Sequence, residues 1–230
     1  MRELLQIGLF PVVLTLITFR AAQWLQSRLR SPLLNPILVS TVMILCFMAL
    51  TGYDNESYQS GASNLTWLIT PATVCLAIPM YEQLAILSKN WRAILAGIAT
   101  GAAASLVMVL LFCLAVGFDR ELTVSLLPKS VTSAIGVPLS QLSGGIGAIT
   151  TPVIIITGII AGSLAELLFQ TLKISDPIAQ GVALGTAGHV VGTSRANEMG
   201  PLTGAVSSLS LVVAGLLTSV LFPIAVSFVP

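Results

Sequence analysis

The segment Gly181–Glu198 combines the only histidine of the chain, His189, with an arginine, Arg195, among glycines and hydroxyl side chains. An imidazole exchanges a proton near neutral pH, and a guanidinium can hold a carboxylate with two parallel hydrogen bonds. The flanking sequence is apolar, and a charged side chain at the centre of a membrane costs about 2.5–3.5 kcal/mol on insertion scales. We therefore predict that His189, Thr193 and Arg195 bind a small acid inside the membrane and that His189 relays a coupled proton.

This set of side chains requires an interrupted helix. In a regular helix His189 and Thr193 share a face, whereas Arg195 lies about 240° further round. Gly188 and Gly192 permit the break that would bring the three side chains together. The alternatives are that His189 is a hydrogen-bonded core histidine and that Arg195 anchors a helix end at the cytoplasmic side.

A second polar cluster surrounds Lys129. The hydroxyl side chains that accompany it are Ser130, Thr132 and Ser133. Pro128 suits the first position of a helix, and a helix start presents free amide donors and a positive dipole end. We expect these residues to bind the carboxylate of the same acid. The alternative is that Lys129 extends to the membrane interface, near the charged residues 119–121.

Two prolines predict a third interrupted segment. Pro71 and Pro79 each remove a backbone donor and obstruct the preceding helical turn, so we expect a broken helix here. Glu82 follows Pro79 by about one turn and is a further candidate for carrying a coupled proton. Its alternative role is a solvated ion pair with Lys89 or Arg92.

The composition defines the elements that must position these residues. Hydrophobic residues make up 55% of the 230 residues and charged residues 8%, and the mean hydropathy is +0.97. Soluble domains contain about 25% charged residues, so we predict an all-α, polytopic membrane protein. The candidate spans are 4–26, 33–52, 66–87, 92–117, 122–142, 147–171, 177–198 and 202–228. Seven or eight of them cross, because one broken segment could be re-entrant.

The chain also shows signs of internal duplication within one transmembrane domain, 1–230. Phe10–Val13 resembles Thr151–Ile154, and Asn35–Ile37 resembles Asp176–Ile178 at the same separation along the chain. We expect two related halves, about 1–117 and 140–230, linked by a broken segment 118–142. Many transporters are built from such inverted repeats, which meet at the membrane midplane.

The three interrupted segments resemble the LrgB/CidB family of bacterial membrane proteins. The phrases that carry the likeness are PLLNPILVS (32–40), TPATVCLAIPMYEQL (70–84), LPKSVTSAIG (127–136), GGIGAIT (144–150), ALGTAGHVVGTSRA (183–196) and GAVSSLSLVVAGLLT (204–218). The likeness covers nearly the whole chain in order. One departure is Val137-Pro138-Leu139, where the family often has Met followed by an acidic or small residue, so no acidic role is carried over.

The resemblance implies a multi-pass protein of the bacterial cytoplasmic (inner) membrane, encoded beside a small LrgA/CidA-type membrane partner. The family was named as antiholin-like, modulating murein hydrolase export and lysis. It is also similar to the C-terminal half of the plastid glycolate/glycerate translocator, and bacterial relatives are linked to pyruvate uptake.

We therefore expect a secondary transporter of small monocarboxylates such as glycolate, glycerate, pyruvate or lactate, coupled to protons. The alternative is an antiholin-like regulator, whose small-residue helix faces would receive the partner. Those faces contain Gly97, Gly101, Gly162, Gly204 and Gly215. No nucleophile–base set, metal-ligand spacing or cofactor motif is present, so neither an enzyme nor a cofactor is expected. The net charge of +1 argues against nucleic acid, and transporters of this size are commonly homodimers.

Overall fold

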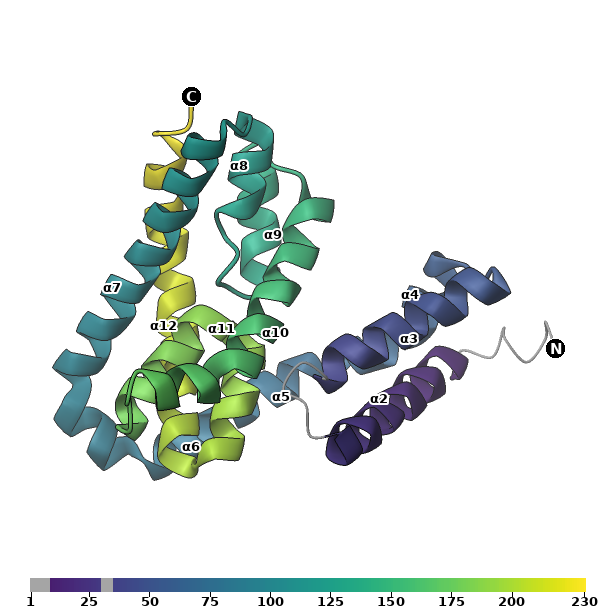
Figure 1. The fold of residues 1–230 in the computed structure, drawn as a ribbon, viewed down its shortest axis with the longest axis horizontal. Helices are drawn as coiled ribbons and strands as arrows, with labels where there is room; N and C mark the ends of the chain where they lie inside the picture. The colour runs from purple at the N-terminus through teal and green to yellow at the C-terminus, as the bar shows by residue number, and fades with distance from the viewer. Residues whose placement is uncertain (1–8, 30–34) are drawn as a thin grey trace. The chain divides into compact units, whose positions relative to one another are not determined.

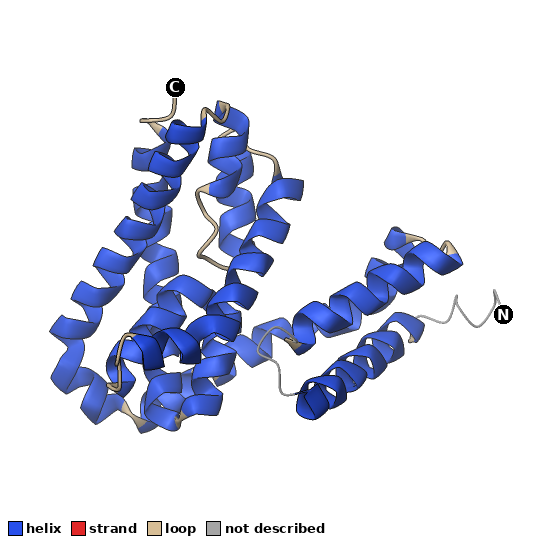
Figure 2. Cartoon of the chain, in the orientation of Figure 1, coloured by secondary structure: helices blue, strands red, loops and turns tan. Residues whose placement is uncertain are grey.

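The computed structural model describes residues 9–29 and 35–230, and this part of the chain consists of helices and connecting turns without strands (Figure 2). The prediction of an all-α protein is confirmed. Residues 4–8 and 33–34, which begin the first two candidate spans, lie outside the described residues. The chain divides into two compact units, Met1–Cys75 and Leu76–Pro230.

The described part of the first unit contains four helices. They are α2 (Phe10–Leu29), α3 (Pro36–Thr51), α4 (Asn55–Trp67) and α5 (Ile69–Cys75). The side chains of Asn35 and Asp54 cap α3 and α4 by accepting hydrogen bonds from backbone amides. Thr15 of α2 shares a hydrogen bond of 2.7 Å with the Tyr58 hydroxyl of α4, which ties these two helices together.

The second unit contains the residues of both polar clusters. Its helices are α6 (Ala77–Glu82), α7 (Leu84–Val116), α8 (Arg120–Leu126), α9 (Ser133–Leu142), α10 (Gly147–Thr171), α11 (Pro177–Met199) and α12 (Pro201–Val226). Two apolar clusters join α7 to α12 along their length, one near the starts of both helices and one near their ends. The two helices therefore run in the same direction, from the lower to the upper end of this unit in Figure 1.

Four runs in the described part of the chain are long and apolar enough to cross a membrane. They are Leu65–Glu82, α7, α10 and α12. Helix α3 is apolar but has only 16 residues. Membrane character is thereby supported, whereas a count of seven or eight crossings is not.

The expected interruptions at the prolines of the first half are present. The helix is interrupted at Leu68 and again at Leu76, which separates α4, α5 and α6. Pro71 and Pro79 each follow one of these interruptions by three residues. A proline cannot donate to the carbonyl four residues earlier and obstructs it sterically, so the helix breaks in the turn before the ring.

Residues 122–142, predicted as one span, instead form a helical hairpin. A Cβ atom at Gly136 in α9 would lie 3.2 Å from the carbonyl oxygen of Pro128. Further up the hairpin, Gly145 lies against both Ser125 of α8 and Ser140 of α9. Helices α8 and α9 are therefore antiparallel, and their tip is the turn Leu127–Thr132.

The prediction that Pro128 begins a helix is wrong. It lies in the turn after α8, and Thr132 is the N-cap of α9. The chain must reverse here, so the proline ring interrupts one helix rather than starting the next.

Helix α11, also predicted as a span, folds back on itself. His189 has φ 41° and ψ −129°, which divides α11 into an arm before it and an arm after it. A Cβ atom at Gly192 would lie 2.2 Å from the carbonyl oxygen of Leu184, so residues on the two arms lie side by side. Leu184 and Ala196 also share one apolar cluster. The expected break near Gly188 and Gly192 is thus present, and it is a reversal of direction.

The two hairpins enter from opposite ends of the unit. The α8–α9 hairpin begins at the upper end, where Arg120 donates a hydrogen bond of 2.6 Å to the Val229 carbonyl beyond α12. The α11 hairpin begins at the lower end, because its first arm runs parallel to α12: Gly181 lies against Thr203, and Gly185 against Ser207. Neither segment crosses the unit, so both polar clusters lie on the tips of hairpins.

Candidate functional site

The tips of the two hairpins meet at Ile154 of α10. A Cβ atom at Gly136 of α9 would lie 2.6 Å from Ile154 Cδ1. The carbonyl oxygen of Ile154 is 2.9 Å from His189 Nε2 at the tip of the α11 hairpin. The structure therefore brings the Lys129 turn and the His189 break to the same level of α10.

Lys129 is partly buried and surrounded by hydroxyl groups. Its Nζ donates to Ser130 Oγ at 3.0 Å and to Ser105 Oγ of α7 at 3.5 Å, and the two hydroxyls are 3.0 Å apart. Both ion pairs recorded within the described ranges involve Arg195, so Lys129 has no carboxylate partner there. An enclosed cation with only neutral partners favours a bound anion.

His189 is buried, with 5% of its surface exposed. A carbonyl oxygen only accepts, so Nε2 donates to Ile154 and, in the neutral ring, Nδ1 is an acceptor. A Cβ atom at Gly158 would lie 2.6 Å from His189 Cε1, so this glycine makes room for the ring. His189 has the hydrogen bond expected of a core histidine.

The other hydroxyls predicted for the site have separate roles in the structure. Thr193 is 1% exposed, donates to the His189 carbonyl at 2.8 Å and shares a hydrogen bond of 2.9 Å with Ser207 of α12. It therefore fastens the second arm of α11. Thr132 and Ser133 begin α9 beside Lys129, and the Thr132 side chain makes no capping hydrogen bond.

Two hydroxyls of this region were missed in the sequence. Ser105 lies in the apolar run of α7, and Thr186 lies one turn before His189 in α11. The methyl group of Thr186 lies against Gly101, which is one turn before Ser105. A Gly and a Ser four residues apart in α7 were the available signal, but small residues in membrane helices more often serve packing.

Arg195 is not brought to Lys129. Its guanidinium, about two turns beyond the tip, forms ion pairs with Glu166 of α10 and Glu198 of α11. The Arg195 side chain is 33% exposed. The role of Arg195 as a ligand of the substrate carboxylate stays a prediction. In this structure its guanidinium group binds the side-chain carboxylates of Glu166 and Glu198.

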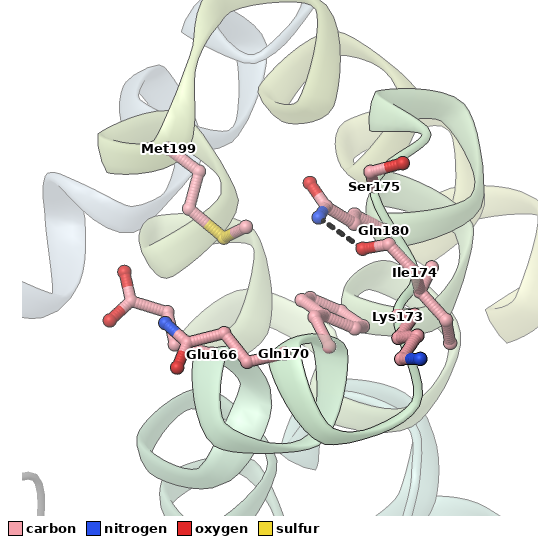
Figure 3. A pocket seen from close by; sticks show the side chains of 8 residues that line it. Glu166, Gln170, Lys173, Ile174, Ser175, Gln180 and Met199 are labelled. Atoms are coloured by element: carbon pink, nitrogen blue, oxygen red, sulfur yellow. Dashed lines mark hydrogen bonds between the residues drawn. The ribbon is translucent and has the colours of Figure 1, made fainter.

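A cavity of about 590 Å³ opens at the lower end of the unit, beside Glu166. Met199 lies on one wall and Ser175 and Gln180 lie on the other (Figure 3). Gln180 donates to the Ile174 carbonyl at 2.8 Å, which holds the loop between α10 and α11. The cavity thus lies at the open end of the α11 hairpin, away from its tip.

The ion pair between Arg195 and Glu166 can be measured with a double-mutant cycle. Arg195→Ala and Glu166→Gln are each expected to lower the free energy of unfolding by less than about 1 kcal/mol, because the pair is partly exposed. The double variant should lose less than the sum of both losses. Thermal unfolding in detergent provides the measurement, and strict additivity would contradict a coupled pair.

Glu82, the remaining coupling candidate, is exposed at the end of α6. No ion pair to Lys89 or Arg92 is recorded among the described side chains. The condition for a buried proton carrier is therefore not met in this state, and neither is the alternative of a formed ion pair.

Comparison with known proteins gives one family. The sequence model of the LrgB-like family matches residues 15–228, which is nearly the whole chain. No solved structure matches the chain.

Proposed function

The chain belongs to the LrgB-like family, and we propose that it is a secondary transporter of small monocarboxylates in the bacterial cytoplasmic membrane. The substrates are acids of the size of glycolate, glycerate, pyruvate and lactate. The observation that carries this proposal is Lys129, a partly buried cation at the tip of a helical hairpin, whose hydrogen bonds to described side chains both go to hydroxyls.

In this proposal each tip contributes a different group. Lys129 binds the carboxylate, with Ser130 and the start of α9 as further donors. His189 lies opposite and accepts a hydrogen bond from a substrate hydroxyl or relays a coupled proton. Arg195 becomes a second carboxylate ligand only when its pairs with Glu166 and Glu198 open.

The opposite orientation of the hairpins supports alternating access. A substrate held between two tips is covered on the upper side by α8–α9 and on the lower side by the arms of α11. Opening one hairpin at a time would release the substrate to one side only, as alternating access requires.

Uptake by the purified protein in liposomes tests the proposal. We expect saturable accumulation of at least one of the four acids, and faster accumulation when a pH gradient drives protons in the same direction. Liposomes without protein are the control. Failure of all four acids to accumulate, with and without the gradient, would contradict the transporter.

A second candidate is an antiholin-like regulator that binds an LrgA/CidA-type partner, and family membership favours it. One argument for it is weakened by packing. Several small-residue faces expected to receive the partner lie against this chain's own side chains: Gly97 against Val182, Gly101 against Thr186, Gly204 against Asn197 and Gly215 against Ile135. Altered pore formation by the partner, without any carboxylate transport, would support the regulator. The oligomeric state measured in the same preparation would test the proposed homodimer.

A further inference from the structure

We propose that the hydroxyl of Thr186 recognises the oxygen on carbon 2 of the substrate and so selects 2-oxygenated acids over plain short-chain acids. This inference rests on the proposed transport function and names a residue for it. Thr186 lies in the first arm of α11, one turn before the His189 tip.

The hydroxyl of Thr186 is enclosed and unused. Only 6% of the residue is exposed, and its Oγ1 has no hydrogen-bond partner within the described structure. A buried polar group without a partner costs about 1–3 kcal/mol, so such groups are few in native proteins and call for an explanation.

Several other helical threonines of this chain form a hydrogen bond to their own backbone. Thr151 donates to the Gly147 carbonyl at 3.0 Å, and Thr171 donates to the Leu167 carbonyl at 2.7 Å. Thr186 does not make the equivalent bond to the carbonyl four residues earlier. Its side chain instead places the methyl group against Gly101 of α7, where a Cβ atom would lie 2.9 Å from Thr186 Cγ2 and 4.0 Å from Oγ1.

The position of this hydroxyl fits a small acid bound by Lys129. Gly101 and Ser105 are one turn apart on α7, about 5–6 Å, and Ser105 contacts the Lys129 ammonium. The Lys129 ammonium and the Thr186 side chain therefore contact positions one turn apart on α7, and a two- or three-carbon acid with a hydrogen bond of about 2.8 Å at each end can bridge two groups placed in this way. The carboxylate would bind Lys129 and the neighbouring 2-oxygen would bind Thr186.

The Thr186 hydroxyl and the His189 ring differ in whether they can donate a hydrogen bond to the substrate. A hydroxyl both donates and accepts, so Thr186 can bind either a 2-hydroxyl or a 2-keto oxygen. His189 donates its Nε2 proton to Ile154, so its neutral ring can only accept and cannot bind a keto oxygen. For keto acids Thr186 is therefore the group that recognises the 2-oxygen.

The test measures selectivity rather than rate alone. Proteoliposomes containing wild type, Thr186→Val or Thr186→Ser are compared for uptake of lactate, pyruvate and propionate, which differ at carbon 2. Valine keeps the shape and loses the hydroxyl, and serine keeps the hydroxyl and loses the methyl. We expect wild type and Thr186→Ser to prefer lactate and pyruvate, and Thr186→Val to lose at least about 10-fold of that preference.

Ser163→Ala is the matched control, because Ser163 Oγ in α10 is also buried without a hydrogen-bond partner among residues 9–29 and 35–230, and it lies nine residues beyond Ile154. Its selectivity should equal that of wild type. An unchanged preference in Thr186→Val, or an equal loss in Thr186→Ser, would overturn this inference alone. If valine prevents folding, the preference for lactate and pyruvate over propionate is compared between Thr186→Ala and Thr186→Ser instead. Wild type that moves none of the four proposed acids, assayed beside propionate, would overturn the proposed function instead.

Discussion

Replacement of Lys129 by methionine is expected to reduce carboxylate uptake at least about 30-fold. Methionine keeps the length of the side chain and removes the charge, so a bound carboxylate would lose its ionic partner in a partly buried site. Loss of one partner of a buried, hydrogen-bonded charge pair costs about 2–5 kcal/mol, and 1.4 kcal/mol is a factor of ten. Initial uptake rates in proteoliposomes over a range of substrate concentrations would measure the effect.

Lys89→Met is the control for this variant, because Lys89 is an exposed lysine near the start of α7. It should transport as wild type does. The Lys129 ammonium is partly buried without a carboxylate partner among the described residues, which destabilises the folded state. Lys129→Met should therefore unfold at the same temperature as wild type or above it. A Lys129→Met protein with wild-type uptake would remove Lys129 from the site.

Gly192→Ala is expected to separate the two arms of the α11 hairpin and to abolish transport. The added Cβ would lie 2.2 Å from the carbonyl oxygen of Leu184, and a backbone atom cannot move aside as a flexible side chain can. Overpacking of this kind costs typically about 1–3 kcal/mol. Here it falls on the residue directly before Thr193, whose hydroxyl contacts Ser207 of α12. Thermal unfolding in detergent and uptake in liposomes should both be impaired.

Gly162→Ala provides the comparison for Gly192→Ala. The nearest atoms to a Cβ at Gly162 lie 3.6 Å away, which is an ordinary contact, and Gly162 is also a helical glycine beside α11. Its unfolding temperature should equal or exceed that of wild type, because alanine has the better helix propensity. If Gly192→Ala behaved like Gly162→Ala, the close approach of the two arms would be contradicted.

The helical class, membrane character and positions of the breaks were predictable from the sequence. Apolar runs predict helices, and the effects of Pro71, Pro79 and the glycines around His189 on a helix are local. The direction of the chain after a break is not local. Whether the chain continues or reverses at His189 depends on how the second arm packs against Leu184 and α12. The distribution of apolar residues along the sequence does not reveal this packing.

The charged residues of the site were predicted by type but not by partner. Lys129 and His189 lie in polar stretches that stand out against an apolar background, so the sequence identifies both. The pairing of Arg195 with Glu166 joins residues from two helices, and their contact follows from the helix register that the folded hairpin sets. Ser105 and Thr186 were missed because isolated hydroxyls in membrane helices usually bond to their own backbone.

The α11 hairpin has a consequence for how the chain is inserted during synthesis. Its arms are not among the described runs apolar enough to enter a bilayer alone, and its first arm packs closely on Thr203 and Ser207 of α12. The ribosome produces α12 after α7, α10 and α11, so the hairpin first emerges without its contacts to Thr203 and Ser207. Its packing is therefore complete only once α12 is in place. Chains stalled before that point would present an unburied polar segment to the proteases of membrane quality control.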